Sequence, residues 1–138
     1  MRFLLDTSAL IAHNRQEPGW ARVQALLEES GSEVLAASVS LTEFARRLRE
    51  LGASDEEARR TAEDYRELLD EIVPIDDRVA FTAFDIGCAL VERLPLADAL
   101  IAAAARERGA CLVHRDRHMA SIPTSLLEQI DLSKHPDP

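Results

Sequence analysis

Four acidic residues stand where their side chains could act together on a metal ion. Asp6 and Asp116 each follow an apolar run, while Glu43 and Asp98 stand near the starts of predicted helices. Carboxylate oxygens are the ligands that Mg²⁺ and Mn²⁺ prefer. Four carboxylates that meet in a folded protein repel one another unless protons or cations neutralise them. The residues therefore predict metal-dependent chemistry if the fold brings them together.

Asp6 ends an apolar run at residues 1–5 that shows no alternation of polar and apolar side chains. Such a run predicts a parallel strand buried on both faces. Thr7 or Ser8 is predicted to cap the helix that follows. Asp6 would then lie at the carboxyl end of a central strand, where open α/β sheets bind their ligands. The alternative is that Asp6 only caps the helix.

Glu43 and Asp98 differ in how well a structural role explains them. Glu43 follows Ser40 at the spacing of a capping box, which is a sufficient structural explanation. Asp98 is the only charged residue between Leu96 and Ala105, in a predicted helix that is apolar on every side and therefore buried. The helix dipole stabilises a carboxylate by about 0.3–1 kcal/mol, less than the cost of burying an unpaired charge. Asp98 is therefore expected to have a cationic partner.

Asp116 follows the apolar run Ala110–Val113 by three residues. Its structural alternative is a turn or a helix cap. In a parallel sheet covered by helices, the carboxyl ends of strands and the amino ends of helices share one edge. All four acids are therefore expected to converge at that edge.

The whole chain alternates predicted strands with predicted helices, which is typical of an α/β fold. We expect a central parallel sheet of four to five short strands with helices on both faces, in a single domain over residues 1–132 and a flexible tail over 133–138. A helix over residues 54–71 has a narrow apolar stripe that could pack on the core or on a partner. Predicted strands cover 1–5, 33–37, 72–75, 110–113 and 130–132, and the other predicted helices begin near 9, 20, 40, 77 and 95.

The composition of the chain limits the classes of protein to which it can belong. The chain has 138 residues and a net charge of −9, which argues against a general nucleic-acid binder with a basic surface. Cys88 and Cys111 lie in apolar stretches and are predicted to be reduced core thiols. The sequence shows no signal peptide and no run long enough to span a membrane, so a cytoplasmic protein is expected.

Four segments resemble the acidic motifs of PIN-domain ribonucleases. They are LLDTSAL with Asp6, SLTEFARRL with Glu43, PLADALIAAAA with Asp98 and LVHRDRHM with Asp116. Their order and the chain length resemble the VapC toxins of bacterial type II toxin–antitoxin pairs. The resemblance implies a three-layer PIN-like fold, Mg²⁺- or Mn²⁺-dependent endoribonuclease activity that leaves a 5′-phosphate, a homodimer, and inhibition by a cognate antitoxin.

The resemblance also assigns roles to the acids. Asp6 and Asp98 would ligate the metal directly, Glu43 would help to hold it or act through a bound water, and Asp116 would complete the site or help to seat a second ion. Three departures stand in the last motif. His114 replaces the usual Thr or Ser, His118 stands where many members have an acid, and Met119 replaces an aromatic residue. His114 is expected in a solvated loop.

An acidic protein that cleaves RNA still has to bind phosphate. One or more of the arginines beside Glu43 and Asp116 are predicted to contact it, with Arg46 and Arg117 as first choices and Ser8 beside the first acid. The other candidates are Arg47, Arg49 and Arg115. The alternative for these arginines is a solvated or ion-paired face. The functional alternative is a PIN-fold module that binds RNA or protein without nuclease activity.

Overall fold

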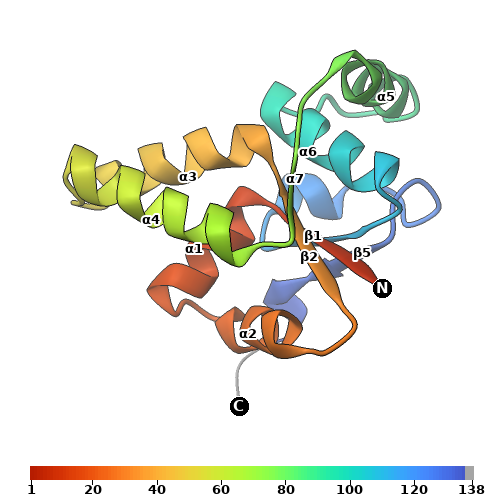
Figure 1. Cartoon of the computed structure of the whole chain (residues 1–138). Coiled ribbons are helices and arrows are strands. Elements are labelled where there is room, and N and C mark those ends of the chain that lie inside the picture. The colour runs from red at the N-terminus through yellow and green to blue at the C-terminus, as the bar shows by residue number, and fades with distance from the viewer. Residues whose placement is uncertain (136–138) are drawn as a thin grey trace.

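The computed structural model of the chain describes residues 1–135 and contains one parallel sheet of five strands (Figure 1). The strand order is β3-β2-β1-β4-β5, so the first strand lies in the middle, as its apolar sequence predicted. Every pairing in the sheet is parallel. The strands are β1 (Arg2–Leu5), β2 (Glu33–Ala37), β3 (Glu71–Val73), β4 (Cys111–His114) and β5 (Gln129–Asp131).

Helices cover both faces of the sheet and form the three layers that were predicted (Figure 1). One face carries α1 (Thr7–Arg15), α2 (Trp20–Glu28), α3 (Ser38–Glu50) and α4 (Asp55–Leu68). The other face carries α5 (Asp77–Cys88), α6 (Leu96–Glu107) and the short α7 (Arg117–Ala120).

Alternate residues of the central strand pack in two separate hydrophobic cores. Phe3 and Leu5 pack in the core under α1–α4, whereas Leu4 packs in the core under α5–α7. The apolar stripe of α4 lies in the first core, with Tyr65 edge-on to Phe44, so the stripe packs on the core of this chain. Burial on both faces explains why β1 shows no polar alternation.

The structure corrects several local predictions. The cap of α1 is Asp6 itself and not Thr7 or Ser8. Helix α3 begins at Ser38, so Ser40 lies inside the helix and the predicted capping box with Glu43 does not form. Cys111 is buried as predicted, but Cys88 is exposed because it ends α5 on the solvent side.

The predicted tail also begins with regular structure. Leu132–Lys134 form a 3₁₀ helix capped by Asp131, which accepts hydrogen bonds from both the backbone and the side chain of Ser133. The rest of the tail, residues 136–138, lies outside the part of the chain that the structure describes.

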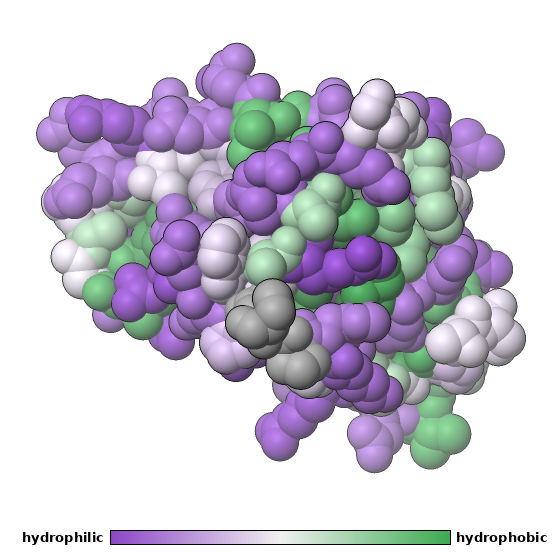
Figure 2. Space-filling view, turned by 90° about the horizontal axis from the view of Figure 1, so that it is seen from below, coloured by the Kyte–Doolittle hydropathy of each residue, from purple (hydrophilic) through white to green (hydrophobic). Residues whose placement is uncertain are grey.

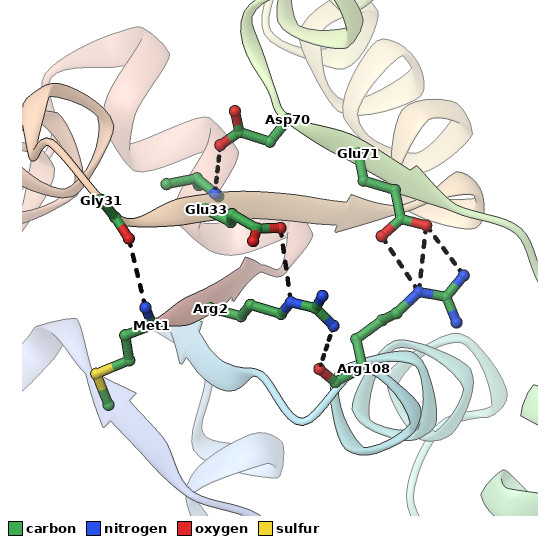
Figure 3. A network of polar contacts seen from close by, with 8 residues as sticks. Met1, Arg2, Gly31, Glu33, Asp70, Glu71 and Arg108 are labelled. Atoms are coloured by element: carbon green, nitrogen blue, oxygen red, sulfur yellow. Dashed lines mark hydrogen bonds and ion pairs between the residues drawn. The ribbon is translucent and has the colours of Figure 1, made fainter.

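The amino-terminal edge of the sheet is tied by charged side chains (Figure 3). Arg2 pairs with Glu33 over 3.5 Å and donates to the carbonyl of Arg108 over 3.1 Å. Arg108 in turn makes a forked contact with both carboxylate oxygens of Glu71, at 3.0–3.2 Å. Asp70 accepts a hydrogen bond from the backbone of Val34. The charged side chains at this edge of the sheet are therefore paired, in contrast to the acids at the carboxyl-terminal edge.

The face that carries α2 is mainly hydrophilic, with hydrophobic residues in small separate areas (Figure 2). Within residues 1–135, no helix is both long enough and apolar enough to cross a membrane.

Candidate metal centre

The carboxyl-terminal edge of the sheet holds a cavity of about 380 Å³ that all four predicted acids line. It opens where β1 and β4 end and where α3 and α6 begin. The convergence predicted from the topology is therefore present. The lining residues are Asp6, Thr7, Ser8, Ile11, Glu17, Glu43, Arg47, Asp98, Arg115 and Asp116.

Asp6 is the most deeply placed of the acids, with 2% of its surface exposed. Its Oδ1 accepts hydrogen bonds from the Ser8 hydroxyl at 2.6 Å and from the Ala9 backbone N–H at 2.9 Å. Burial nevertheless raises the pKa of Asp6 to about 7, and the nearby charges of Asp116 and Asp98 add to the rise. Asp6 thus caps α1 and also lines the cavity, so capping is not its only place in the structure.

Glu43 is held from across the cavity. Its Oε1 accepts a hydrogen bond from the Thr7 hydroxyl over 2.7 Å, so the start of α1 orients a side chain of α3. Glu43 lies in the second turn of α3 and not at the third position of its first turn. The contact with Thr7 replaces the capping role that the sequence offered as an alternative.

Asp98 lies in the first turn of α6, but this turn is not wholly buried as the apolar sequence had predicted. Leu96 is 76% exposed, and burial becomes complete only from Ile101 onward. The Asp98 side chain keeps 16% of its surface exposed. Burial, and then the charges of Asp116 and Glu43, raise the pKa of Asp98 to about 6, against a lowering by His118. Among residues 1–135, no arginine or lysine forms an ion pair with this carboxylate.

Asp116 caps the short helix α7, with its Oδ1 accepting from the His118 backbone N–H over 2.8 Å. The His118 ring completes a tight group. Its Nδ1 lies 3.3 Å from Asp116 Oδ1 and 3.8 Å from Asp98 Oδ2. One ligand atom from each of these three residues lies within 4.8 Å of the others. His118 was noted in the sequence only as a departure from the motif, and its spacing two residues after Asp116 was the available signal.

His114 corrects a further expectation, because it is fully buried in β4 and does not lie in a solvated loop. Its Nε2 lies 2.7 Å from Gln129 Oε1, and its Nδ1 accepts from the Asp116 backbone N–H over 3.2 Å. The Gln129 partner could not be predicted from the sequence, since Gln129 lies on the neighbouring strand β5.

The charge of the cavity fits a divalent cation. Five carboxylates line it, against only the two guanidinium groups of Arg47 and Arg115. Arg115 pairs with Glu17 at the rim over 3.3 Å, and Arg47 pairs with Glu50 over 3.1 Å. The pKa values of Asp6 and Asp98 rise chiefly because burial removes water from the two carboxylates, and the neighbouring acids add to the rise. Oxygen donors with one imidazole nitrogen beside them suit Mg²⁺ or Mn²⁺.

The arginines at the cavity, Arg47 and Arg115, are among the candidates from the sequence but are not its two first choices. Arg46 lines a separate groove between α3 and α4, and Arg117 is the first residue of α7. Arg47 lies four residues after Glu43, on the same side of α3, so helical spacing was the signal that could have ranked it above Arg46. Ser8 lines the cavity and accepts a hydrogen bond from the Arg115 backbone N–H over 2.8 Å.

The sequence matches the PIN domain family over residues 3–124, and the chain belongs to this family. The resemblance seen in the four acidic motifs is thereby confirmed. A search of curated protein sequences finds no match.

Several solved structures that share the fold come from VapBC proteins. A chain of VapBC2 from Rickettsia felis, bound to a promoter DNA fragment, is 18% identical with a TM-score of 0.75, over 95% of this chain and 98% of that chain. For DNA-bound VapBC from Salmonella typhimurium the identity is 21%, the TM-score 0.74 and the coverage 96% and 98%. A chain of VapBC-5 from Mycobacterium tuberculosis is 25% identical with a TM-score of 0.64, over 94% of this chain and 98% of that chain. These likenesses agree with a PIN fold over nearly the whole chain.

Proposed function

We propose that this chain is a metal-dependent endoribonuclease of the VapC toxin type, which hydrolyses RNA phosphodiester bonds with Mg²⁺ or Mn²⁺ and is inhibited by a cognate antitoxin. The convergence of Asp6, Glu43, Asp98 and Asp116 on one cavity carries the proposal. The raised pKa values of Asp6 and Asp98 support it, because a site that is costly to ionise without a cation is suited to bind one.

Each acidic residue would have its own role at the metal. Asp6 and Asp98 would ligate the ion, Glu43 would help to hold it directly or through water, and Asp116 would complete the site or help to seat a second ion. Bound there, the metal would polarise the scissile phosphate and lower the pKa of a bound water. No side chain of the cavity needs to act as the attacking nucleophile.

Neighbouring groups orient these ligands. The Ser8 hydroxyl donates to Asp6 and the Thr7 hydroxyl donates to Glu43, so each carboxylate presents a fixed oxygen to the cavity. Arg47 and Arg115 stand at the rim, where they could bind RNA phosphates. These arginines would offset the repulsion between RNA and a chain of net charge −9.

The test is cleavage of a mixed RNA pool by purified Asp6→Asn and Asp98→Asn variants with Mg²⁺ or Mn²⁺. Both substitutions are nearly isosteric, and an asparagine in place of Asp6 would keep the helix cap. We expect cleavage to fall by about 100-fold or more in each, beyond what loss of an outer hydrogen-bond partner causes. Undiminished cleavage by both variants would refute the proposal. RNA binding without cleavage by the natural chain would instead favour the binding-module alternative.

The proposed antitoxin can be tested in cells. Induction of this chain should arrest growth, and co-expression of the protein encoded beside it should restore growth. The Asp98→Asn variant is the control, because it should be harmless with or without the neighbour. Arrest by this variant would show that any toxicity does not come from the acidic site.

We also propose a homodimer. Phe81 and Phe84 on α5 are 70% and 68% exposed, and Leu96 on the adjoining α6 is exposed as well. Large exposed apolar side chains that lie together are typical of association surfaces. We expect Phe84→Glu to shift the molar mass measured by light scattering toward the monomer. Leu68→Glu, on exposed α4 surface, should leave the mass unchanged, and equal masses for all three proteins would contradict this surface.

A further inference from the structure

Two consecutive backbone N–H groups after β4 each donate a hydrogen bond to a side chain. Arg115 N–H donates to Ser8 Oγ over 2.8 Å, and Asp116 N–H donates to His114 Nδ1 over 3.2 Å. Ser8 also donates to Asp6, so the first contact joins this loop to the deepest acid. The second contact joins the loop to the interior, because His114 is fully buried.

The direction of the second contact fixes the chemistry of the His114 ring. A backbone N–H can only donate, so Nδ1 must accept and carries no hydrogen. The ring hydrogen must then reside on Nε2, which lies 2.7 Å from Gln129 Oε1. The amide of Gln129 is oriented to accept it, because its Nε2 donates to the Ile122 carbonyl over 2.7 Å. The hydrogen bonds thus form one continuous chain between Gln129 and Asp116.

From this chain of contacts we infer that His114 is a positioning residue, which acts as the Nε2–H tautomer and sets the place of the Asp116 carboxylate at the metal centre. The inference rests on the proposed function for its metal, but its hydrogen-bond pattern is a property of the folded chain alone. The Asp116 carboxylate is further fixed by His118 N–H, so both ends of the residue are held. Partners that orient metal ligands in this way commonly affect metal affinity.

Two substitutions distinguish the roles of the two ring nitrogens of His114. In His114→Asn, an amide oxygen can take the place of Nδ1 and accept from Asp116 N–H, while the contact with Gln129 is lost. In His114→Gln, the longer side chain can reach Gln129, but no acceptor remains for Asp116 N–H. Each variant removes part of the ring and one hydrogen bond, so the two are matched in their general effect on packing.

The readouts are Mn²⁺ affinity by calorimetry and thermal unfolding of the metal-free proteins. We expect His114→Gln to weaken Mn²⁺ binding by about 10- to 100-fold, and His114→Asn to stay within a few-fold of the natural chain. A merely structural histidine would instead give the two variants losses of affinity that follow their losses of stability. Unchanged Mn²⁺ affinity in a folded His114→Gln would overturn the inference.

Nitrogen-15 NMR of the natural chain without metal gives a second, independent test. The His114 ring should show a hydrogen on Nε2 and a bare Nδ1, and an Nδ1–H tautomer would overturn the inference even if the variants fail to fold. Failure of the proposed function looks different. It would appear as a natural chain that binds no Mn²⁺ while its His114 tautomer is the one expected here.

Discussion

The Thr7 hydroxyl donates a hydrogen bond to the Glu43 carboxylate over 2.7 Å, across 36 positions of the chain. Thr7 directly follows Asp6 and begins α1, whereas Glu43 belongs to α3. The contact therefore couples the helix that the first acid caps to the helix that carries the second. It is a partly buried bond to a charged acceptor, which makes it stronger than an ordinary surface contact.

Replacing Thr7 by Val should release Glu43 with little change in shape. We expect the free energy of unfolding to fall by about 1.5–3 kcal/mol, in keeping with loss of a hydrogen bond to a charged group, and Mn²⁺ affinity to fall with it. Chemical denaturation and calorimetry measure the two effects. Thr7→Ser keeps the hydroxyl and is the matched control, so an equal loss of affinity in both variants would show that the hydroxyl contact with Glu43 does not set the affinity.

The raised pKa values of Asp6 and Asp98 predict an unusual dependence of stability on pH. Their carboxyls titrate at about 7 and about 6 in the folded chain, against an ordinary value of 3.8. Between about pH 4 and pH 7 the folded chain therefore holds protons that the unfolded chain has lost. The metal-free protein should lose stability as the pH rises through this range and level off above it.

Thermal unfolding in EDTA from about pH 4.5 to about pH 8 checks this prediction, since the melting temperature should decrease with pH. Asp6→Asn should flatten the slope because it removes the group with the largest shift. Saturating Mn²⁺ should reverse the trend, because the metal binds only the deprotonated carboxylates. A melting temperature in EDTA that rises steadily over the same range would speak against the buried, uncompensated acids.

Arg47 and Arg115 should contact RNA, as their place at the cavity suggests. In EDTA, where cleavage is blocked, Arg47→Ala and Arg115→Ala should each weaken RNA binding and reduce the slope of log K against log salt by about 1. Arg59→Ala on α4 is the control for a general change in charge. Arg46→Ala and Arg117→Ala, tested alongside, decide whether the sequence-based choice of arginines holds. A slope that no cavity variant changes would exclude these contacts.

The forked contact between Arg108 and Glu71 should stabilise the fold without affecting the site. Glu71 holds the pKa of Arg108 above its ordinary value, chiefly through their hydrogen bonds. We expect Arg108→Ala to lower the free energy of unfolding by about 0.5–1 kcal/mol and to leave Mn²⁺ affinity unchanged. Arg59→Ala breaks a single, more exposed pair with Glu63 and should cost less. Equal losses would show that the fork adds nothing.

The fold could be predicted from sequence because its main signals are local. The run that ends at Asp6 and the alternation of elements after it define a parallel sheet, and chain topology then brings the acids to one edge. Helix starts were less predictable. Ser40 and Glu43 match a capping box, yet α3 begins at Ser38. The packing of its buried residues, and not the local cap signal, sets where this helix starts.

The details of the site depended on contacts between distant segments. His114 looked like a loop residue because nothing near it in the chain reveals Gln129 on the next strand. Asp98 looked more buried than it is, since an alanine-rich sequence does not reveal that the first turn of α6 reaches the surface. Positions of acids could thus be predicted, whereas the partners that orient them could not.

The three-residue strand β5 is an outer strand of the sheet and pairs only with β4. Outer strands of this length open by local fluctuations that leave the rest of a domain intact, and their amides exchange with solvent earlier than those of central strands. Gln129 belongs to this strand, so each opening of β5 also removes the partner of His114. A short outer strand of the sheet thereby governs how rigidly the last of the four acids is held.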